Sequence, residues 1–503
     1  MAKTPTSTSD STTAPPPSAI EIVDWDGPSD PTNPFNWPLG KKWLVTFLAL
    51  LASFSTMLNG TMITVAHEAI NARFGVSDAR FPHSYWPVTA WAAGGALFSL
   101  LVLPIMEDFG VRRVFLGTYG VFLAFIVPQA VAQNFATLVV SRFFSGGCVS
   151  ILANTSAGVI GNVWEDERGR TLPMTLYITV YLVGSSMGPV IGAAVFASLS
   201  WRWISYVQLI VYGALFIVYA ALFPESRGSA ILGRRAQSLR NSGRNAFTAA
   251  EADAVPLPRL MLDSAKRPLQ MLVTEPVVLA AALMAALIIG LIYLFTQSVE
   301  QVFVGLFHMT AIEAGYVQSA VIIGELVGGL GALVSARLYF ASAKRNTEIP
   351  GVPIPEARLY LAVVAAFAGM AGGMFVYAWT SVSSLPWVAP AVGLAMVGAG
   401  NVVVIIGVAD YLVDAYAKYA GSAIAAVTLG ENLSAAFLPL AAQSMYTNLG
   451  YRWASSLLGF IALALSFSPV VLVVWGRKIR AKSPFMKEAT NDKKKESEVS
   501  KVG

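Results

Sequence analysis

The sequence contains one cysteine and few charged residues. Cys148 is the only cysteine among 503 residues, and Asp, Glu, Lys and Arg together make up 13% of the chain, compared with about 25% in a typical soluble protein. A single cysteine cannot form a disulfide within the chain, so a disulfide-stabilised fold is excluded. Hydrophobic residues make up 55% and the mean hydropathy is +0.61, which excludes a disordered chain and a single water-soluble domain. The composition indicates a polytopic membrane protein.

Residues that commonly carry catalysis or bind metals are also scarce. The three histidines, His67, His83 and His308, lie between apolar runs and lack the spacing of metal ligands. No glycine-rich phosphate-binding loop lies between a strand and a helix. We therefore expect a protein that is not an enzyme and that holds no metal ion and no cofactor.

Twelve long apolar runs are separated by charged, proline-containing or polar segments. A hydrocarbon core about 30 Å thick requires roughly 20 residues of helix, which is close to the length of each run. The runs are continuous and rich in Ala, Leu, Gly and Val, which is typical of transmembrane helices and not of the alternating strands of a β-barrel. The predicted spans are residues 43–65, 85–106, 114–133, 137–163, 172–197, 204–223, 276–300, 314–336, 359–379, 388–411, 420–446 and 453–475.

The distribution of basic residues predicts the orientation of these spans. With a cytoplasmic N-terminus, 29 of the 34 Lys and Arg residues lie on the cytoplasmic side, four lie in outer loops and Arg142 lies within a span. Cytoplasmic loops of membrane proteins carry an excess of basic residues. We therefore expect both termini in the cytoplasm and interpret the net charge of +5 as a result of orientation, with no nucleic-acid partner.

The longest connection, residues 224–275, carries eight basic residues and divides the chain into six spans and six spans. Trp201-Arg202-Trp203 and Tyr451-Arg452-Trp453 begin the last span of each half at equivalent positions. The predicted fold class is an all-α polytopic membrane protein with twelve transmembrane helices in two pseudo-symmetric six-helix bundles, and such repeats with a site between them suit a transporter. The predicted parts are a cytoplasmic tail (1–42), the first bundle (43–223), a basic cytoplasmic linker (224–275), the second bundle (276–475) and a basic cytoplasmic tail (476–503).

The fifth span carries a stripe of small residues. Gly184, Gly188 and Gly192 recur every four residues and so share one helix face, and Pro189 removes a backbone donor behind Gly188. Such a face allows another helix to approach closely. Gly324 and Gly328 in the eighth span are a candidate partner stripe, although for glycines alone we prefer general small-residue packing.

Two groups of charged residues stand out near or inside the membrane. Glu107, Gly110, Arg112 and Arg113 form a short connection between the second and third spans, which predicts either a gate that holds helix ends together or an ordinary basic cytoplasmic loop. Arg142 lies in the fourth span, where a cation is costly and is usually functional or paired. The alternative is an arginine that extends its charged end to the membrane surface.

These motifs resemble the major facilitator superfamily, and specifically its fungal twelve-span drug:proton antiporter branch. GPVIG with its upstream glycines resembles the antiporter motif of span five, Arg142 with Gly146 resembles the span-four motif, and the loop after span two resembles the superfamily signature. Branch-level likeness comes from the strings DWDGPSDPTNPFNWP, WRWISY, PESRGSAILGRRAQSLR, PEARL and YLVDAYAKYAGSA. The resemblance covers residues 24 to about 483 and implies the fold and the transport mechanism of that family.

The sequence departs from the family pattern at three places. In the loop signature, Leu103 replaces the usual glycine and Val111 precedes Arg112. In span eleven Glu431 occupies a place where the family often has arginine, and in span seven the string FTQSVEQVF replaces an acidic-aromatic pattern. These departures weaken any transfer of substrate from better-known relatives.

Four carboxylates are candidates for carrying protons or binding substrate together with Arg142. A carboxylate removed from water holds its proton more tightly, so a cavity that opens and closes can couple proton binding to conformation. The alternative for each carboxylate is a structural hydrogen bond or exposure to water. The candidates are Glu325, Glu431, Glu300 and Asp410. Candidate cavity-lining residues, which lipid contact would also explain, are Tyr177, Tyr181, Met187, Phe295 and Gln297.

The resemblance and these residues together predict a proton-coupled exporter of a small amphiphilic compound, such as a drug, a fungal secondary metabolite or an organic acid. Proton-linked uptake or facilitated diffusion of an organic acid or nutrient is the alternative, and a non-transporting receptor is a more distant one. We expect protons, a small-molecule substrate and the lipid bilayer as partners, and function as a monomer. The expected location is a fungal plasma membrane, with a vacuolar or other organellar membrane as the alternative.

Overall fold

The computed structural model describes residues 21–78, 83–252 and 257–488. Helices dominate this part of the chain. The long helices before the linker are α1 (Leu39–Thr61), α3 (Trp86–Phe109), α4 (Val111–Ala130), α5 (Phe135–Val163), α6 (Glu167–Phe196) and α7 (Arg202–Leu222). Those after it are α11 (Pro276–Phe307), α13 (Ser319–Ser342), α14 (Tyr360–Val364), which continues through a π-helical stretch (Ala365–Ala371) into α15 (Gly372–Thr380), then α16 (Val388–Tyr416) and α17 (Ala420–Lys482).

Shorter elements connect these helices. They are α2 (His67–Phe74), α8 (Gly228–Asn241), α9 (Ala249–Ala252), α10 (Leu257–Thr274), α12 (Ala311–Val317), and the strands β1 (Glu21–Ile22) and β2 (Ala246–Phe247). Short 3-10 helical turns, labelled η, also connect the helices. The turns used below are η2 (Thr64–Ala66), η3 (His83–Tyr85) and η5 (Pro355–Leu359). Several helices begin at a side-chain cap: Asn134 accepts from the Thr137 amide and Asp166 from the Gly169 amide, which satisfies amides that have no partner inside the helix.

Within the described residues, nine segments are long and apolar enough to cross a membrane. The longest, Val388–Lys482, spans 95 residues and contains α16 and α17. Ala417, with a positive φ of 43°, separates these two helices, and Gly450 breaks α17 with a non-helical φ of 75°. Division of this segment at Ala417 and Gly450 turns one segment into three. With α3 added as well, the described helices are consistent with the twelve predicted spans.

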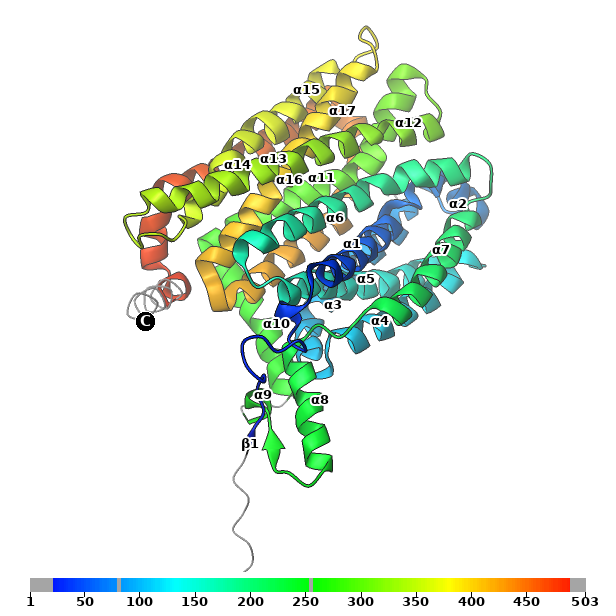
Figure 1. Cartoon of the computed structure of the whole chain (residues 1–503). Helices are drawn as coiled ribbons and strands as arrows, with labels where there is room; N and C mark the ends of the chain where they lie inside the picture. The colour runs from blue at the N-terminus through cyan, green and yellow to red at the C-terminus, as the bar shows by residue number, and fades with distance from the viewer. Residues whose placement is uncertain (1–20, 79–82, 253–256, 489–503) are drawn as a thin grey trace, which may run out of the picture.

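The helices form two groups that meet along a seam (Figure 1). We call α1–α7 the first half and α11–α17 the second half. Within the first half α3 packs on α5 and α1 on α6, and within the second half α11 packs on α17 and α13 on α16. Across the seam, α3 contacts α17 and α6 contacts α13. Any site between the halves must therefore lie among these helices.

The glycine stripe of α6 packs on α1 and not on α13. A Cβ on Gly184 would lie 2.8 Å from the Phe54 carbonyl oxygen, and one on Gly188 would lie 2.8 Å from the Met62 nitrogen and overlap the Thr61 hydroxyl. Gly324 and Gly328 instead approach the backbone of α16. The prediction that these two stripes pair was therefore wrong, because each stripe serves close packing inside its own half.

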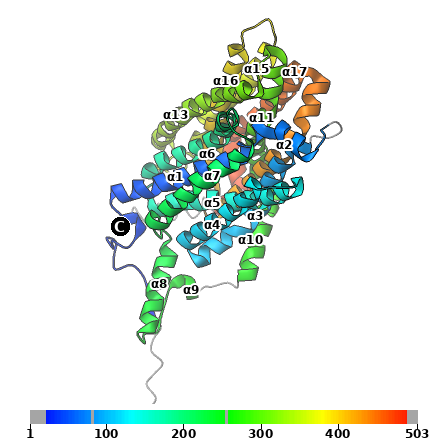
Figure 2. The same cartoon turned by 90° about the vertical axis from the view of Figure 1, so that its right-hand side faces the viewer.

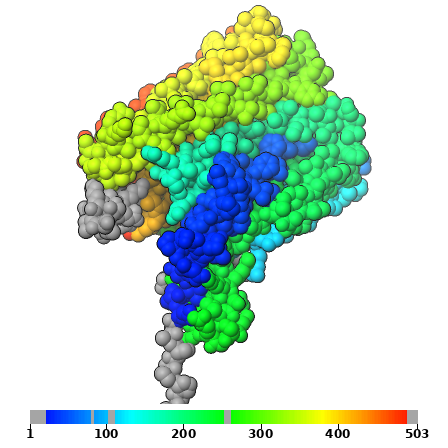
Figure 3. Space-filling model, viewed as in Figure 1, coloured from blue at the N-terminus to red at the C-terminus, as the bar shows by residue number. Residues whose placement is uncertain are grey.

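The segment before α1 packs on the linker in a small unit that the sequence analysis did not predict. β1 pairs in parallel with β2, and the Val23 amide donates to the Phe247 carbonyl at 2.8 Å. Arg235 on α8 pairs with Asp26 and Asp30, and Arg244 pairs with Glu21 at 2.7 Å. This unit projects from one end of the helices, as Figure 2 and the space-filling view in Figure 3 show.

We predict that Gly188→Ala lowers the free energy of unfolding by about 1–3 kcal/mol, because the added methyl group would overpack the contact with α1. Gly161→Ala is the matched control, since a Cβ on this α5 glycine meets nothing within 4 Å. Thermal unfolding of both variants, purified in detergent, measures the difference. Equal stability of the two variants would contradict the close α1–α6 contact.

Candidate functional site

A cavity of about 210 Å³ lies between the two halves. Residues of α1, α3, α5 and α6 line it from one side and residues of α11, α16 and α17 from the other. Its wall is mainly aliphatic. The aromatic lining residues are Trp91, Tyr177, Tyr181 and Tyr293, and the polar and charged ones are Ser150, Asn154, Asp410, Thr428, Glu431 and Asn432.

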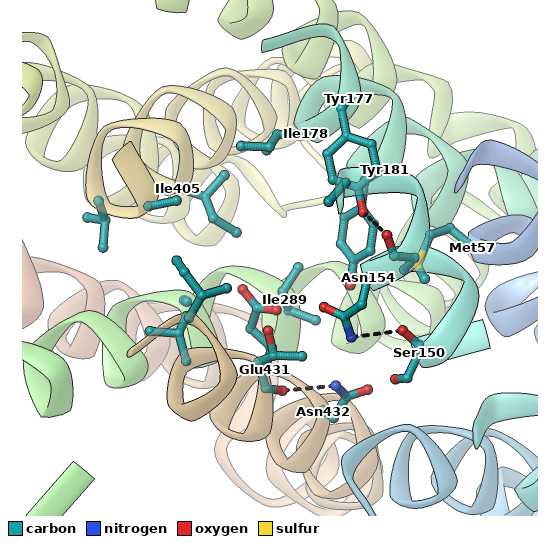
Figure 4. Close-up of a pocket in the computed structure, with 18 of the residues that line it drawn as sticks. Met57, Ser150, Asn154, Tyr177, Ile178, Tyr181, Ile289, Ile405, Glu431 and Asn432 are labelled. Carbon is teal, nitrogen blue, oxygen red and sulfur yellow. Dashed lines mark hydrogen bonds between the residues drawn. The ribbon is translucent and has the colours of Figure 1, made fainter. Parts of the chain in front are cut away.

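Glu431 faces the first half across this cavity. Figure 4 shows its carboxylate on α17 opposite Tyr181 and Asn154. Asn154 donates to the Ser150 carbonyl oxygen at 2.9 Å, and Tyr177 donates to the Ala153 carbonyl oxygen at 2.8 Å, so both bond to α5. Among the described residues, Glu431 has no hydrogen-bond or ion-pair partner. Its carboxylate is therefore available to a proton or a ligand.

Asp410, the second carboxylate of the cavity, belongs to an ion-pair network around Arg358. Arg358 on η5 donates to Asp410 at 3.1 Å and to Asp414 at 3.0 Å, both on α16, and to Glu167 at 2.6 Å. Its guanidinium carbon lies 3.4 Å from the centre of the Tyr339 ring. Because Glu167 begins α6, this network joins the two halves at what we call the Arg358 end of the helices.

Arg358 was not among the predicted site residues, although it lies in the string PEARL that supported the family resemblance. Glu356 of the same string pairs with Arg480, which also pairs with Glu348 at 2.8 Å. The available signal was a pair of charged residues next to the start of a predicted span. Glu356 and its partner Arg480 are 124 residues apart in the chain, and Arg358 and its partner Glu167 are 191 residues apart. Only the tertiary structure brings these charges together.

Arg142 is 1% exposed and does not reach the membrane surface. Its guanidinium donates to the carbonyl oxygens of Asn59 at 2.6 Å, Gly60 at 2.5 Å and Pro87 at 3.3 Å. Among the described residues, no carboxylate pairs with it, and it is not among the residues that line the cavity. It contacts the cavity wall through Asn59, whose side chain accepts from the Trp91 indole at 2.9 Å. Arg142 therefore lies behind the cavity wall, with its guanidinium bonded to backbone oxygens of the first half.

Glu325 lies at the seam outside the cavity. It is completely buried, and one carboxylate oxygen accepts from the Ser186 hydroxyl at 2.7 Å. The other oxygen has no partner among the described residues. Ser186 is on α6 and Glu325 on α13, so this contact joins the halves. Burying a charged carboxylate with one hydrogen bond is costly.

The remaining sequence candidates lie elsewhere. Tyr177 and Tyr181 line the cavity, whereas Met187, Phe295 and Gln297 are not among its lining residues. Phe295 packs edge-on against Tyr377, with ring centres 5.9 Å apart. Glu300 lies beside His67, with its carboxylate 3.6 Å from the imidazole, at the opposite end of α11 from Pro276.

The connection after α3 is held within the first half. Gly110 has a φ of 78°, and Glu225 accepts from the Val111 amide at 3.0 Å. Arg112 donates to the Ala220 carbonyl oxygen at 2.9 Å and Arg113 is exposed. The side chain of Glu107 lies outside the described part of the chain. The described contacts of this connection are thus with α7 and the linker.

The family is established by comparison with known sequences. A model described as "Major Facilitator Superfamily" matches residues 48–436. The chain belongs to the major facilitator superfamily. Members of this superfamily are transporters and not enzymes, so the chain is a multi-pass membrane transporter of small molecules.

Relatives and a solved structure agree with this assignment. The chain is 32% identical to the ascochitine biosynthesis cluster MFS transporter of Didymella fabae, over 92% of this chain and 89% of that protein. It is 32% identical to the citrinin biosynthesis cluster MFS transporter mrr1 of Monascus ruber, over 93% of each chain. The superfamily fold is also seen in the proton:xylose symporter XylE, which superposes with a TM-score of 0.61 at 13% identity and covers 87% of this chain and 97% of XylE.

We predict that Glu167→Gln loosens the Arg358 end, because it removes the one carboxylate that ties Arg358 to the first half. Losing a hydrogen bond between charged groups, typically 1.5–3 kcal/mol, should shift the closed–open equilibrium about tenfold. The labelling rate of a cysteine placed at the cavity residue Ala157, in a Cys148→Ala background, reports this opening. Glu165→Gln, an exposed neighbour, is the control. An unchanged labelling rate in Glu167→Gln would contradict a role of this ion pair in closure.

Proposed function

We propose that this transporter is a proton-coupled antiporter that exports a small amphiphilic compound by alternating access. The observation that supports this proposal most directly is the cavity between the halves, whose wall is mainly apolar and which holds the unpaired carboxylate of Glu431. Apolar walls with a few polar groups suit amphiphilic ligands. A carboxylate without a fixed partner is the group that a proton and a ligand can use in turn.

Proton binding and movement of the halves are linked through Glu325 and Glu431. A carboxylate shielded from water favours its neutral form, and one that meets water favours its charged form. Glu325 is buried against Ser186 while the halves touch, so separating α6 from α13 admits water to it. Proton release then follows opening, and each ligand shifts the equilibrium by its difference in affinity for the two states.

The Arg358 end is the cytoplasmic end in this proposal. The basic linker and the segment before α1 project from the inner side of the membrane in this orientation, in agreement with the excess of basic residues there. The Arg358 network then closes the inner access route. Contacts at the other end, including the approach of Gly315 on α12 to Ala193 on α6, close the outer route. We further propose that the protein acts as a monomer in a fungal plasma membrane with both termini in the cytoplasm.

The charges of the cavity favour a neutral or basic substrate over an organic acid. Of the described residues that line it, Glu431 and Asp410 are acidic and none is Lys, Arg or His. Arg142 and Arg358 are both engaged by protein oxygens. The two related transporters of ascochitine and citrinin biosynthesis clusters support a fungal secondary metabolite as the exported compound.

We predict that a strain lacking this protein retains more of one amphiphilic compound inside the cell, because the export route is lost. Comparative metabolite profiling of cells and medium, with and without the gene, measures the ratio of internal to external compound. The compound should carry no net negative charge at the cytoplasmic pH. Retention of a carboxylate compound alone would contradict the substrate class, and depletion of a compound from the cells would contradict export.

We predict that Glu431→Gln abolishes accumulation driven by a pH gradient, since an amide cannot exchange a proton at this position. Proteoliposomes loaded with the identified compound, with the gradient imposed in either direction, measure this accumulation. Glu325→Gln should impair the same coupling. Glu313→Gln is the control, because glutamine preserves the capping box that Glu313 forms with Thr310. Gradient-driven transport at the wild-type rate in Glu431→Gln would remove this residue from the coupling mechanism.

A further inference from the structure

Three side chains that bind metals well meet at the end of the helices opposite Arg358. A ring nitrogen of His67 and one carboxylate oxygen from each of Glu68 and Glu300 all lie within 4.8 Å of one another. His67 and Glu68 begin α2 in the first half, and Glu300 is on α11 in the second half. We call this place the His67 end. Glu300 is 232 or more positions from His67 and Glu68 in the chain, so the sequence gave no signal that the three residues meet.

The distances are close to those of a zinc site. His67 Nδ1 lies 3.6 Å from a carboxylate oxygen of Glu300, and two ligand atoms of a tetrahedral zinc ion with bonds of 2.0–2.2 Å lie about 3.4 Å apart. Glu68 is exposed in the first turn of α2, so its side chain can change rotamer to complete the set. His67 Nδ1 also lies 3.0 Å from the Thr64 carbonyl oxygen, and this nitrogen gives up that contact when it binds the ion.

A buried tyrosine next to this cluster has no hydrogen-bond partner. Tyr85 is 2% exposed, and its hydroxyl is unpaired among the described residues. Its ring lies against the His67 imidazole, with centres 5.5 Å apart, and the charges of Glu300, Asp78 and Glu68 act on it. Tyr85 and His67 line a hollow of about 10 Å³, which is roughly the space of one water molecule. Of the three clustered side chains, only that of His67 is among its lining residues. A water in this hollow, bound to an ion at the cluster, would give the hydroxyl a partner.

We propose that His67, Glu68 and Glu300 form a binding site for a divalent transition-metal ion, with Zn²⁺ as the fitting example. One imidazole and two carboxylates are ligands that zinc uses, with water in the fourth position. Mg²⁺ and Ca²⁺ prefer sites made of oxygen ligands alone, so the imidazole selects against them. Because the ligands come from both halves, the ion joins α2 to α11 and stabilises the state in which the His67 end is closed.

Binding of zinc to the purified full-length protein tests the site without any assumption about transport. Isothermal titration with Zn²⁺ should show one site, and Zn²⁺ should raise the unfolding temperature whereas Mg²⁺ should not. His67→Ala and Glu300→Gln should each weaken the affinity at least tenfold. His308→Asn is the matched control: it removes an imidazole just beyond α11 at the same end, and asparagine tolerates the left-handed backbone of that residue, whose φ is 56°. Absence of zinc binding, or equal affinity in His67→Ala and wild type, would overturn the site.

A variant that should bind zinc more tightly tests the site even if the variants that remove a ligand do not fold. Glu300→His replaces a carboxylate by a second imidazole and should strengthen zinc binding, because zinc binds imidazole well. The same substitution would leave zinc affinity unchanged if Glu300 did not contact the ion. Unfolding temperatures without metal show whether each variant is folded.

The effect on the halves is measured separately and rests on the proposed alternating access. In proteoliposomes that transport the identified compound, Zn²⁺ should reduce the rate several-fold, and a chelator should restore it. His67→Ala should abolish this inhibition while His308→Asn retains it. Zinc binding without inhibition would leave the site in place and overturn its role in holding the halves together. Failure of transport in the absence of zinc would contradict the proposed function and not the metal site.

Discussion

A guanidinium buried in apolar protein must find acceptors for its N–H groups, and the fold meets this constraint in two different ways. Arg142 donates to backbone carbonyl oxygens of the first half alone. Arg358 donates to carboxylates from both halves. In the proposed mechanism, backbone acceptors inside one half stay in place when the halves move, so Arg142 moves with its own half. The contact between Arg358 and Glu167 would instead be replaced by water when the halves separate.

The same distinction applies to the other contacts of the cavity. The glycines of α6 bring its backbone against α1, and those of α13 bring its backbone against α16. These contacts are tight and internal to one half, and they would cost much packing to break. Across the seam the contacts include polar and small ones, Ser186 with Glu325 and Gly329 against Thr179, besides the stacked rings of Trp91 and Tyr293. The helices beside the cavity thus belong to two firm groups joined by contacts that water can replace.

How far the sequence predicts this arrangement depends on the range of each interaction. The helices follow from apolar runs, because an unpaired backbone group in lipid is costly and a helix pairs its own. The position of Glu431 in the cavity agrees with its place in the eleventh apolar run. The Arg358 network, the pairing of β1 with β2 and the meeting of His67 with Glu300 depend on contacts between residues far apart in the chain. Phe295 and Gln297 illustrate the same limit, since hydrophobicity marked their helix as buried but could not say which face meets the cavity.

The two carboxylates of the cavity differ in what surrounds them, and this difference connects the site to the closure. Asp410 lines the cavity and also pairs with Arg358, so its charge is already balanced. Glu431 has no such partner, and a proton or a positive group on a ligand is the natural counter-charge for it. A ligand that reaches towards Asp410 competes for a partner of Arg358, and so weakens the network that joins the halves at that end. In the proposed mechanism, a ligand in the cavity therefore favours opening of the Arg358 end, because the ligand and Arg358 compete for the Asp410 carboxylate.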